Sequence, residues 1–332
     1  MFARQRSRCG NSPSNKVSAQ KARQWSPERL HCLFIHLGGN DMLQRKYAGY
    51  LYVLPGFLLI LLFIYFPIVQ NIQFSLFEWS AFSADKTFVG LAQYAKLFHD
   101  PIFYQALVNN IYYAVISLIF QVFGGLVLAA VLEDKVFRKI SPLFRTIYFT
   151  PVIISITVIA LLFDFIYHPQ VGLLNGFLSA IGLESWTRAW VGDSATAIFA
   201  AIAVSQWQSI GYIMMLFIVA IQKIPQELYE AAEIDGASKI RMFFHVTVPQ
   251  VREMTFVTST ITLAGAFTVF NEVYILTGGG PGHASEVLGT YLYQSAFVHD
   301  QMGYASTIAN VILAITLLIS LVQMKLSKTG EE

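Results

Sequence analysis

Residues 50–70 read YLYVLPGFLLILLFIYFPIVQ, and this run decides the fold class of the chain. It contains no Asp, Glu, Lys or Arg. At ~1.5 Å per residue it is long enough to cross ~30 Å of hydrocarbon as an α-helix. A helix that is apolar on every side is either buried in a large core or surrounded by lipid. The run therefore predicts a membrane-spanning helix.

Five further apolar runs follow along the 332 residues. They cover about 107–132, 146–167, 196–221, 255–276 and 303–324. Hydrophobic residues make up 55% of the chain and charged residues 13%, which is about half the charged share usual in soluble domains. A closed β-barrel would show short segments of alternating polarity instead. We therefore predict an all-α integral membrane protein with six transmembrane helices.

The positions of Lys and Arg predict how these helices are oriented. If the N-terminus is cytoplasmic, only Lys86, Lys96 and Arg188 of the 22 basic residues fall on the far side. Basic residues concentrate in cytoplasmic loops. Both termini are therefore predicted to be cytoplasmic, and so is the loop between the fourth and fifth helices. On the far side, residues 277–301 are expected to form a flexible loop.

The chain is expected to have three parts. Residues 1–45 are basic and lack the compact apolar core of a secretory signal, so we expect a disordered cytoplasmic tail. Residues 46–326 form the predicted six-helix transmembrane domain, and residues 327–332 form a short cytoplasmic tail. Met42 also resembles a start site, which leaves open whether residues 1–41 are native and ordered.

The cytoplasmic loop 223–252 is polar, charged and helix-prone, reading KIPQELYEAAEIDGASKIRMFFHVTVPQVR. Pro225 is suited to open a helix, and Gly236 is suited to end it because glycine adopts the left-handed cap conformation at little cost. A second helical piece has apolar residues at helical spacing, at Ile240, Phe243 and Phe244. We predict a helix–turn–helix lying along the membrane, with acidic and small residues offered to a cytoplasmic partner.

The same loop contains a spaced motif. EAA at residues 230–232 is followed by three residues, Gly236, nine residues and then VTVP, which ends at Pro249. This pattern resembles the EAA motif of permease subunits of binding-protein-dependent ABC importers, although valine replaces both aliphatic residues of the usual Ile-x-Leu-Pro. The resemblance implies a coupling helix that sits in a cleft of an ATPase subunit and passes its motion to the membrane helices. The implied coupling residues are Glu230, Ala231, Ala232, Gly236 and Pro249.

The resemblance also implies an assembly. Permeases of this family have the type I ABC importer fold and lie in the prokaryotic cytoplasmic (inner) membrane. The implied partners are membrane lipid, a second permease subunit, two ATPase subunits and an extracytoplasmic solute-binding protein. The second permease subunit is expected to be a different chain, and the alternative is a second copy of this one. ATP and Mg would bind to the ATPase subunits, so no cofactor is expected on this chain. The net charge of +2 gives no indication of a nucleic-acid partner.

Three further stretches resemble the sugar-transport branch of that family. They are FVGLAQYAKLFHDPIFYQALVNNIYY (88–113), VGLLNGFLSAIGL (171–183) and FNEVYILTGGGPG (270–282). The branch includes permeases for maltose, other oligosaccharides and glycerol-3-phosphate. The resemblance therefore implies a sugar or oligosaccharide as the transported solute, with glycerol-3-phosphate or another solute, such as an amino acid, as the alternative.

Polar residues in the middle of apolar helices are the predicted contacts to a sugar. Gln208 and Tyr212 are four residues apart and share a helix face, and the resemblance places solute contacts near Tyr212. Thr262 and Asn271 complete the predicted set. Two further candidates are Gln206 and Thr268. The alternative for each of these residues is a hydrogen bond between helices.

Other classes of protein find less support in the sequence. The glycines at 278–282 lack the Gly-Lys-Ser/Thr of a P-loop, and no such motif occurs elsewhere, so the chain is not expected to hydrolyse ATP. A stand-alone ion-coupled transporter would need carboxylates at mid-membrane, whereas Asp164 and Glu272 lie near the outer ends of their spans; for Glu272 we expect a structural or gating role. The sequence has no protease motif, and Cys9 and Cys32 form neither a disulfide framework nor a zinc spacing. We predict no catalytic residue and no metal site.

Overall fold

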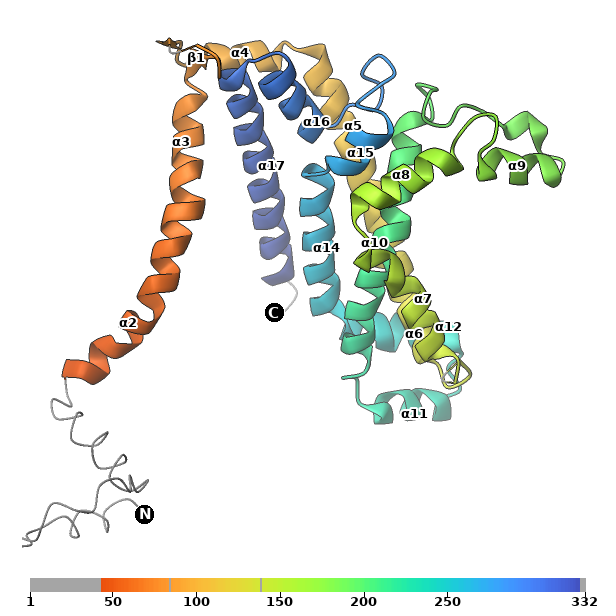
Figure 1. Ribbon diagram of the computed structural model, residues 1–332. Coiled ribbons are helices and arrows are strands. Elements are labelled where there is room, and N and C mark those ends of the chain that lie inside the picture. The colour runs from red at the N-terminus through yellow and green to blue at the C-terminus, as the bar shows by residue number, and fades with distance from the viewer. Residues whose placement is uncertain (1–42, 84, 138, 329–332) are drawn as a thin grey trace, which may run out of the picture. The chain divides into compact units, whose positions relative to one another are not determined.

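The computed structural model of the protein describes residues 43–83, 85–137 and 139–328 (Figure 1). The chain divides into two compact units, residues 1–66 and 67–332. The described part of the first unit is a single apolar helix, α2 (Leu43–Ile60), which continues through the π-helical turn η1 (Leu61–Tyr65). All elements from residue 67 onward belong to the second unit.

The predicted terminal tails lie largely outside the described residues. Residues 1–42 are outside them, whereas residues 43–45 belong to α2. At the other end, α17 (Met302–Lys328) extends into the predicted C-terminal tail, and residues 329–332 lie outside the described part. Helical structure thus extends beyond the predicted domain 46–326 on both sides.

In the part of the chain that the structure describes, five helices are long and apolar enough to cross a membrane. They cover Tyr52–Phe74, Pro101–Glu133, Ala197–Ile221, Arg252–Leu276 and Met302–Lys325. The predicted span 146–167 is instead a pair of helices, α7 (Ser141–Ile153) and α8 (Ile156–Ile166), bent by 100°. Six spans result when this bent pair is counted as one.

The bend between α7 and α8 has a local cause. Pro151 lies in the last turn of α7, and Ile154 and Ser155 are extended, with ψ angles of 138° and 134°. The carbonyl oxygen of Ile154 accepts a hydrogen bond from Gln208 Nε2 at 3.1 Å. Broken helices are tolerated at membrane depth where the freed backbone groups are buried in protein or line a cavity. Residues 146–167 therefore belong to a broken pair of helices and not to one continuous helix.

Two of the long spans also contain irregular turns. The second span joins α5 (Pro101–Ser117) to α6 (Gly124–Glu133) through a π-helical turn, η2 (Leu118–Phe123). The fifth span is interrupted between α14 (Arg252–Phe267) and α15 (Asn271–Leu276). Such irregularities are frequent at functional sites, and both of these border the cavity described below.

Helix α10 (Ala197–Ile221) lies at the centre of the second unit's core. Its first half belongs to an apolar cluster that includes Tyr113 and Val273. Its second half belongs to another cluster with Leu126, in which Phe217 is fully buried. One helix therefore holds together the elements on both sides of it.

Short elements connect the spans. Helix α3 (Phe66–Phe74) is the last part of the first span. At one end of the second unit the connections hold β1 (Phe77–Trp79), β2 (Lys86–Phe88), α4 (Ala92–Phe98), α9 (Leu173–Ala180), η3 (Glu184–Trp186), α16 (Leu288–Tyr293) and η5 (Gln294–Val298). At the other end lie α11 (Gln226–Ile234), α12 (Lys239–Met242), η4 (Phe243–Thr247) and α13 (Val248–Gln250). Figure 1 shows β1, α4 and α16 opposite α11, and we name these the β1 end and the α11 end. The antiparallel pair β1–β2 is a small exception to the predicted all-α fold.

Residues 277–301 differ from the flexible loop predicted there. They contain α16 and η5, and two buried asparagines of α5 hold them in place. Asn109 Nδ2 donates to the carbonyl oxygen of Ala284 at 2.8 Å, and Asn110 Oδ1 accepts from the Leu288 N–H at 2.8 Å. The segment is therefore packed against the helices at the β1 end.

Candidate functional site

A cavity of about 440 Å³, with both polar and apolar residues on its wall, lies between α5–η2, α10 and α14–α15. Its wall includes the four residues predicted as solute contacts, which are Gln208, Tyr212, Thr262 and Asn271. The further candidate Thr268 also lies on the wall. Ser117, Gln121 and Ser209 add further hydroxyl and amide groups. Gln206 is not on the wall; it is buried, and its Nε2 donates to Ser117 Oγ at 3.0 Å. For Gln206 the structure thus favours the helix–helix alternative.

The two predicted residues of α10 differ in their surroundings. Gln208 lines the cavity, but its Nε2 is also the donor to the Ile154 carbonyl oxygen at the break between α7 and α8. Tyr212 lies one turn further along α10 and has 40% of its surface exposed. Gln208 therefore supports the wall as well as lining it, whereas Tyr212 presents an open aromatic surface to the cavity region.

Thr262 has an unpaired hydroxyl group. The residue is 5% exposed, and its Oγ1 has no hydrogen-bond partner among the described residues. Other threonines of the fifth span, such as Thr258 and Thr268, donate back to a carbonyl oxygen of the preceding turn, at 2.8 and 2.9 Å. A buried hydroxyl without a partner is destabilising. Thr262 is part of the cavity wall, but its Oγ1 is buried and does not open onto the cavity.

Glu272 is a residue of the cavity wall that the sequence did not reveal. Its side chain is 8% exposed, and the Tyr113 hydroxyl donates to its Oε1 at 2.5 Å. The sequence predicts Glu272 near the outer end of its span, and in the structure it lies in α15, just after the interruption, on the cavity wall. The sequence offered one signal that Glu272 lines the cavity, which is its position next to Asn271, a predicted solute contact. Asp164, the other carboxylate considered, is exposed on α8 and does not line the cavity.

The 223–252 segment has the predicted helix, glycine stop and second helix. Helix α11 follows Pro225, which lies at the N-cap, and ends just before Gly236, whose φ is +73°. The Gly236 N–H donates to the Glu233 carbonyl oxygen at 3.1 Å, and the Ala237 N–H donates to that of Ala232 at 2.9 Å. These two bonds form a Schellman motif, which satisfies carbonyl groups at the helix end.

The surface of α11 is open to a partner. Leu228 and Ile234 are 40% and 86% exposed, and Ala231 lies between them on the same face. Of the implied coupling residues, Glu230, Ala231, Gly236 and Pro249 are exposed and Ala232 is half-buried. Exposed apolar residues gathered on one helix face are typical of an interaction site.

The sequence matches the family described as "Binding-protein-dependent transport system inner membrane component" over residues 121–328. The chain belongs to this family. It is an ABC importer permease, as the motif at 230–249 implied, and the prediction of a membrane-spanning helical transport subunit is confirmed.

Known relatives of this permease cover most of its length. It is 66% identical over 289 residues to the "Probable ABC transporter permease protein YurN" of Bacillus subtilis (strain 168). The aligned region covers 87% of this chain and 99% of that protein. It is 33% identical over 293 residues to the arabinooligosaccharides transport system permease protein AraP of the same strain, covering 87% and 92%. A solved bacterial alginate ABC transporter, in complex with a periplasmic protein bound to alginate pentasaccharide, contains a chain of the same fold. The TM-score is 0.76 at 23% identity, over 88% of this chain and 98% of that one.

Two ion pairs connect the 223–252 segment of this permease to the loop after α6. Lys239 Nζ lies 2.6 Å from Asp134 Oδ2, and Lys135 Nζ lies 3.6 Å from Glu233 Oε1. The hydrogen bond from Lys239 lowers the pKa of Asp134 below its ordinary value. Because the lysines are largely exposed, each pair contributes at most ~1 kcal/mol. The pairs fix the position of α11 and α12 beside α6 more than they stabilise the fold.

Reversing the charge at position 239 is expected to slow transport moderately. Lys239→Glu places a carboxylate opposite Asp134, and a loss of ~1 kcal/mol corresponds to about a five-fold lower uptake rate of the assembled importer. Adding Asp134→Lys restores the opposite charges and should recover most of the rate. Lys223→Glu changes the same charge within the segment, outside both ion pairs, and serves as the control. A double variant that is slower than Lys239→Glu alone would contradict this role.

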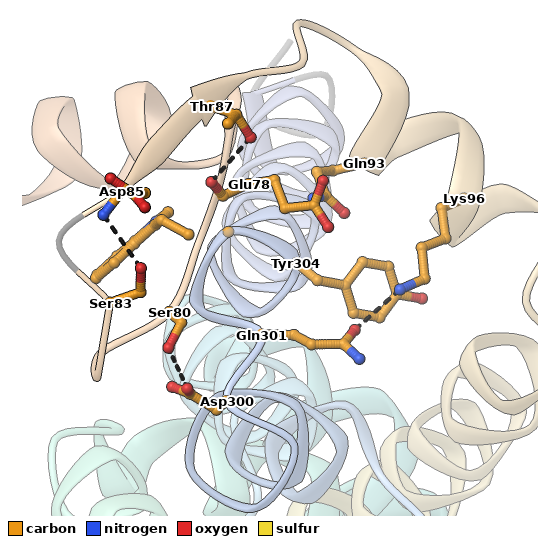
Figure 2. A pocket seen from close by; sticks show the side chains of 12 residues that line it. Glu78, Ser80, Ser83, Asp85, Thr87, Gln93, Lys96, Asp300, Gln301 and Tyr304 are labelled. Carbon is orange, nitrogen blue, oxygen red and sulfur yellow. Dashed lines mark hydrogen bonds between the residues drawn. The ribbon is translucent and has the colours of Figure 1, made fainter.

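A second hollow, of about 360 Å³, opens at the β1 end of this permease (Figure 2). Figure 2 shows Lys96 reaching Gln301, with Nζ 2.9 Å from Oε1, and the same Nζ lies 4.4 Å from the centre of the Tyr304 ring. The Ser80 hydroxyl donates to the Asp300 carboxylate. The acidic residues of the lining are Glu78, Asp85 and Asp300. The sequence pattern does not reveal this hollow, because its residues lie in short connections that come together only in the fold.

Proposed function

We propose that this permease is a membrane-spanning subunit of an ATP-driven importer that carries a sugar or oligosaccharide. An extracytoplasmic solute-binding protein delivers the solute, and two ATPase subunits bind ATP and Mg and supply the energy. A second permease subunit completes the pathway. The α11 end and both termini lie on the cytoplasmic side of the inner membrane, as the distribution of Lys and Arg indicates.

The observation that carries the sugar assignment is the composition of the cavity wall. Hydroxyl and amide groups from several helices converge on a space of about 440 Å³, with aromatic rings of Tyr113, Tyr212 and Phe270 beside them. Solute sites combine apolar and aromatic surface with a few polar groups that fix orientation. The names of AraP and of the alginate transporter point to carbohydrate transport in related or similarly folded proteins.

The connections of the 223–252 segment support the proposed coupling to ATP hydrolysis. Helix α10 ends at Ile221, just before the segment, and α14 begins at Arg252, where the segment ends. Both helices line the cavity, through Gln208 and Tyr212 on α10 and Thr262 on α14. A displacement of α11 by an ATPase subunit would therefore be transmitted directly to two walls of the cavity.

The hollow at the β1 end supports docking of the solute-binding protein. It lies at the end opposite α11, which is the extracytoplasmic end in this orientation (Figure 1). Its lining presents carboxylates and one ammonium group, Lys96, around an open space. Charged groups at the edge of an interface contribute mainly to orientation and to the rate of association.

The test is uptake by the complete importer reconstituted in vesicles with its binding protein. We expect uptake of a neutral oligosaccharide, probed with arabinotriose and maltotriose, that requires ATP. Tyr212→Ala should lower it about ten-fold, as expected for loss of ~1–1.5 kcal/mol of aromatic contact. Tyr112→Ala removes an exposed tyrosine that does not line the cavity and is the matched control.

Two results would contradict the proposal. Uptake by the permease alone without ATP would indicate an ion-coupled transporter. ATP-driven uptake of amino acids or of glycerol-3-phosphate, with none of either oligosaccharide, would reject the sugar assignment.

A further inference from the structure

The cavity wall formed by the described residues has an acidic side chain but no basic one. Glu272 is its one acidic residue, and no Lys, Arg or His lines the cavity within residues 43–83, 85–137 and 139–328. The remaining polar groups of the wall are hydroxyls and amides, which carry no charge. A solute in this cavity therefore meets negative charge from this subunit and no compensating positive charge.

Glu272 also lacks an ionic partner of its own. It is 8% exposed, and the Tyr113 hydroxyl is the one side-chain group seen to donate to it in the described part of the chain. Acidic residues within membrane spans are rare, are usually paired, and commonly mark the pathway of a substrate. Glu272 lies on such a pathway without the usual cation beside it.

A purely structural role explains less of this arrangement. Glu272 is in the first turn of α15, where a carboxylate interacts favourably with the helix dipole. However, α15 has six residues, and an exposed carboxylate would serve that purpose without the cost of burial. An interaction between the Glu272 carboxylate and the entering solute would account for the burial of this residue on the cavity wall.

We propose that Glu272 makes this cavity selective for charge: it admits uncharged and cationic polyhydroxy solutes and disfavours those with carboxylate, sulfate or phosphate groups. This inference rests on the proposed transport of a sugar and narrows its substrate class. Neutral sugars and amino sugars fit the wall, whereas uronic acids and glycerol-3-phosphate do not. The anionic group of such a solute would approach Glu272 on the cavity wall, and like charges repel each other.

The selectivity can be measured with two thiol reagents of opposite charge. Thr268 is exposed and lines the cavity, so Thr268→Cys places a reporter on the wall, in an importer complex whose Cys9 and Cys32 are replaced by Ser. The modification rates by trimethylammonioethyl methanethiosulfonate and sulfonatoethyl methanethiosulfonate give a cation-to-anion ratio. For a unit charge ~8 Å away in a water-filled cavity, Glu272→Gln should lower this ratio about five-fold.

Matched variants separate the charge of Glu272 from other effects. Glu272→Asp keeps the carboxylate and should keep the ratio within about two-fold of the parent. Ser83→Cys lies in the hollow at the β1 end, and its ratio should not respond to Glu272→Gln. Glu78→Gln removes a carboxylate from that hollow and should leave the Thr268→Cys ratio unchanged. Ser209→Cys provides a second reporter on the cavity wall.

Each outcome decides between the two proposals. A ratio that Glu272→Gln leaves unchanged at both wall reporters would overturn the charge selectivity while leaving ATP-driven sugar uptake intact. Wall cysteines that react with neither reagent would also overturn it, because the cavity would then be closed to small charged solutes. If the ratio falls as expected but no neutral sugar is taken up with ATP, the proposed function fails and the electrostatic role of Glu272 stands.

Discussion

Replacing Gly211 with alanine is expected to remove most of the folded permease from the membrane. Gly211 lies in the middle of α10, where the backbone of α7 passes directly against it. A Cβ at this position would collide with the carbonyl group of Tyr148 and would lie 3.1 Å from the Phe149 nitrogen. Because these are backbone atoms, no side chain can rotate away, and the two helices must separate.

The cost of that separation is large for a membrane protein whose helices associate by close packing. Overpacking a tight contact costs ~1–3 kcal/mol, and a clash with backbone lies at the upper end of that range or above it. The separation would also pull Gln208 away from the Ile154 carbonyl that it caps. The complex yield in membranes and its melting temperature in detergent should both fall.

Gly176→Ala is the matched control for this prediction. Gly176 is also a helical glycine, in α9, but nothing lies within 4 Å of the position its Cβ would occupy. Alanine should be neutral there or slightly stabilising, because glycine is a poor helix former. Equal melting temperatures for the parent, Gly176→Ala and Gly211→Ala would show that α7 and α10 do not pack as described.

The membrane-spanning helices could be predicted because composition alone requires them. A run such as residues 50–70 has no stable place in water, and in lipid a single span must be helical to satisfy its own backbone. Composition does not reveal where such a helix breaks. At the 100° bend between α7 and α8, the freed carbonyl group of Ile154 is satisfied by Gln208, which is far away in sequence.

The cavity residues also divide into those that composition reveals and those that depend on tertiary packing. Tyr212, Thr262 and Asn271 could be named because polar residues inside apolar runs are conspicuous. Glu272 is expected only near the outer end of its span, since the interruption at 268–270 leaves no mark in the residue pattern. Which polar residues face one cavity is decided by the way α10 and the fifth span pack together.

The end of α11 is a feature that local chemistry predicts well, and it gives the second prediction of large effect. Gly236→Pro is expected to abolish coupled transport. Proline holds φ near −65°, whereas Gly236 has a φ of +73°, and proline also lacks the N–H that donates to the Glu233 carbonyl oxygen. The Schellman motif would be lost at a cost of ~3 kcal/mol or more, and α11 could no longer turn back into α12.

Uncoupling, rather than unfolding, is the expected consequence of this substitution. Nothing lies within 4 Å of the position a Cβ at Gly236 would occupy, and the residue is exposed, so the core clusters around α10 are not disturbed. The importer should assemble and hydrolyse ATP at a basal rate, yet its uptake should fall by about a hundred-fold for a displacement that costs ~3 kcal/mol. Uptake and ATP hydrolysis measured on the same vesicles give the ratio that reports coupling.

A graded series at position 236 tests the cause. Asparagine tolerates a positive φ and should retain most of the coupling, whereas alanine should lose more of it, at a cost of ~1–2 kcal/mol. The expected order of coupled transport is therefore glycine, asparagine, alanine and proline. If Gly236→Ala and Gly236→Pro transport as well as Gly236→Asn, the left-handed turn does not hold α11 in its coupling position. Force would then have to pass from the ATPase subunit to α10 and α14 by another route.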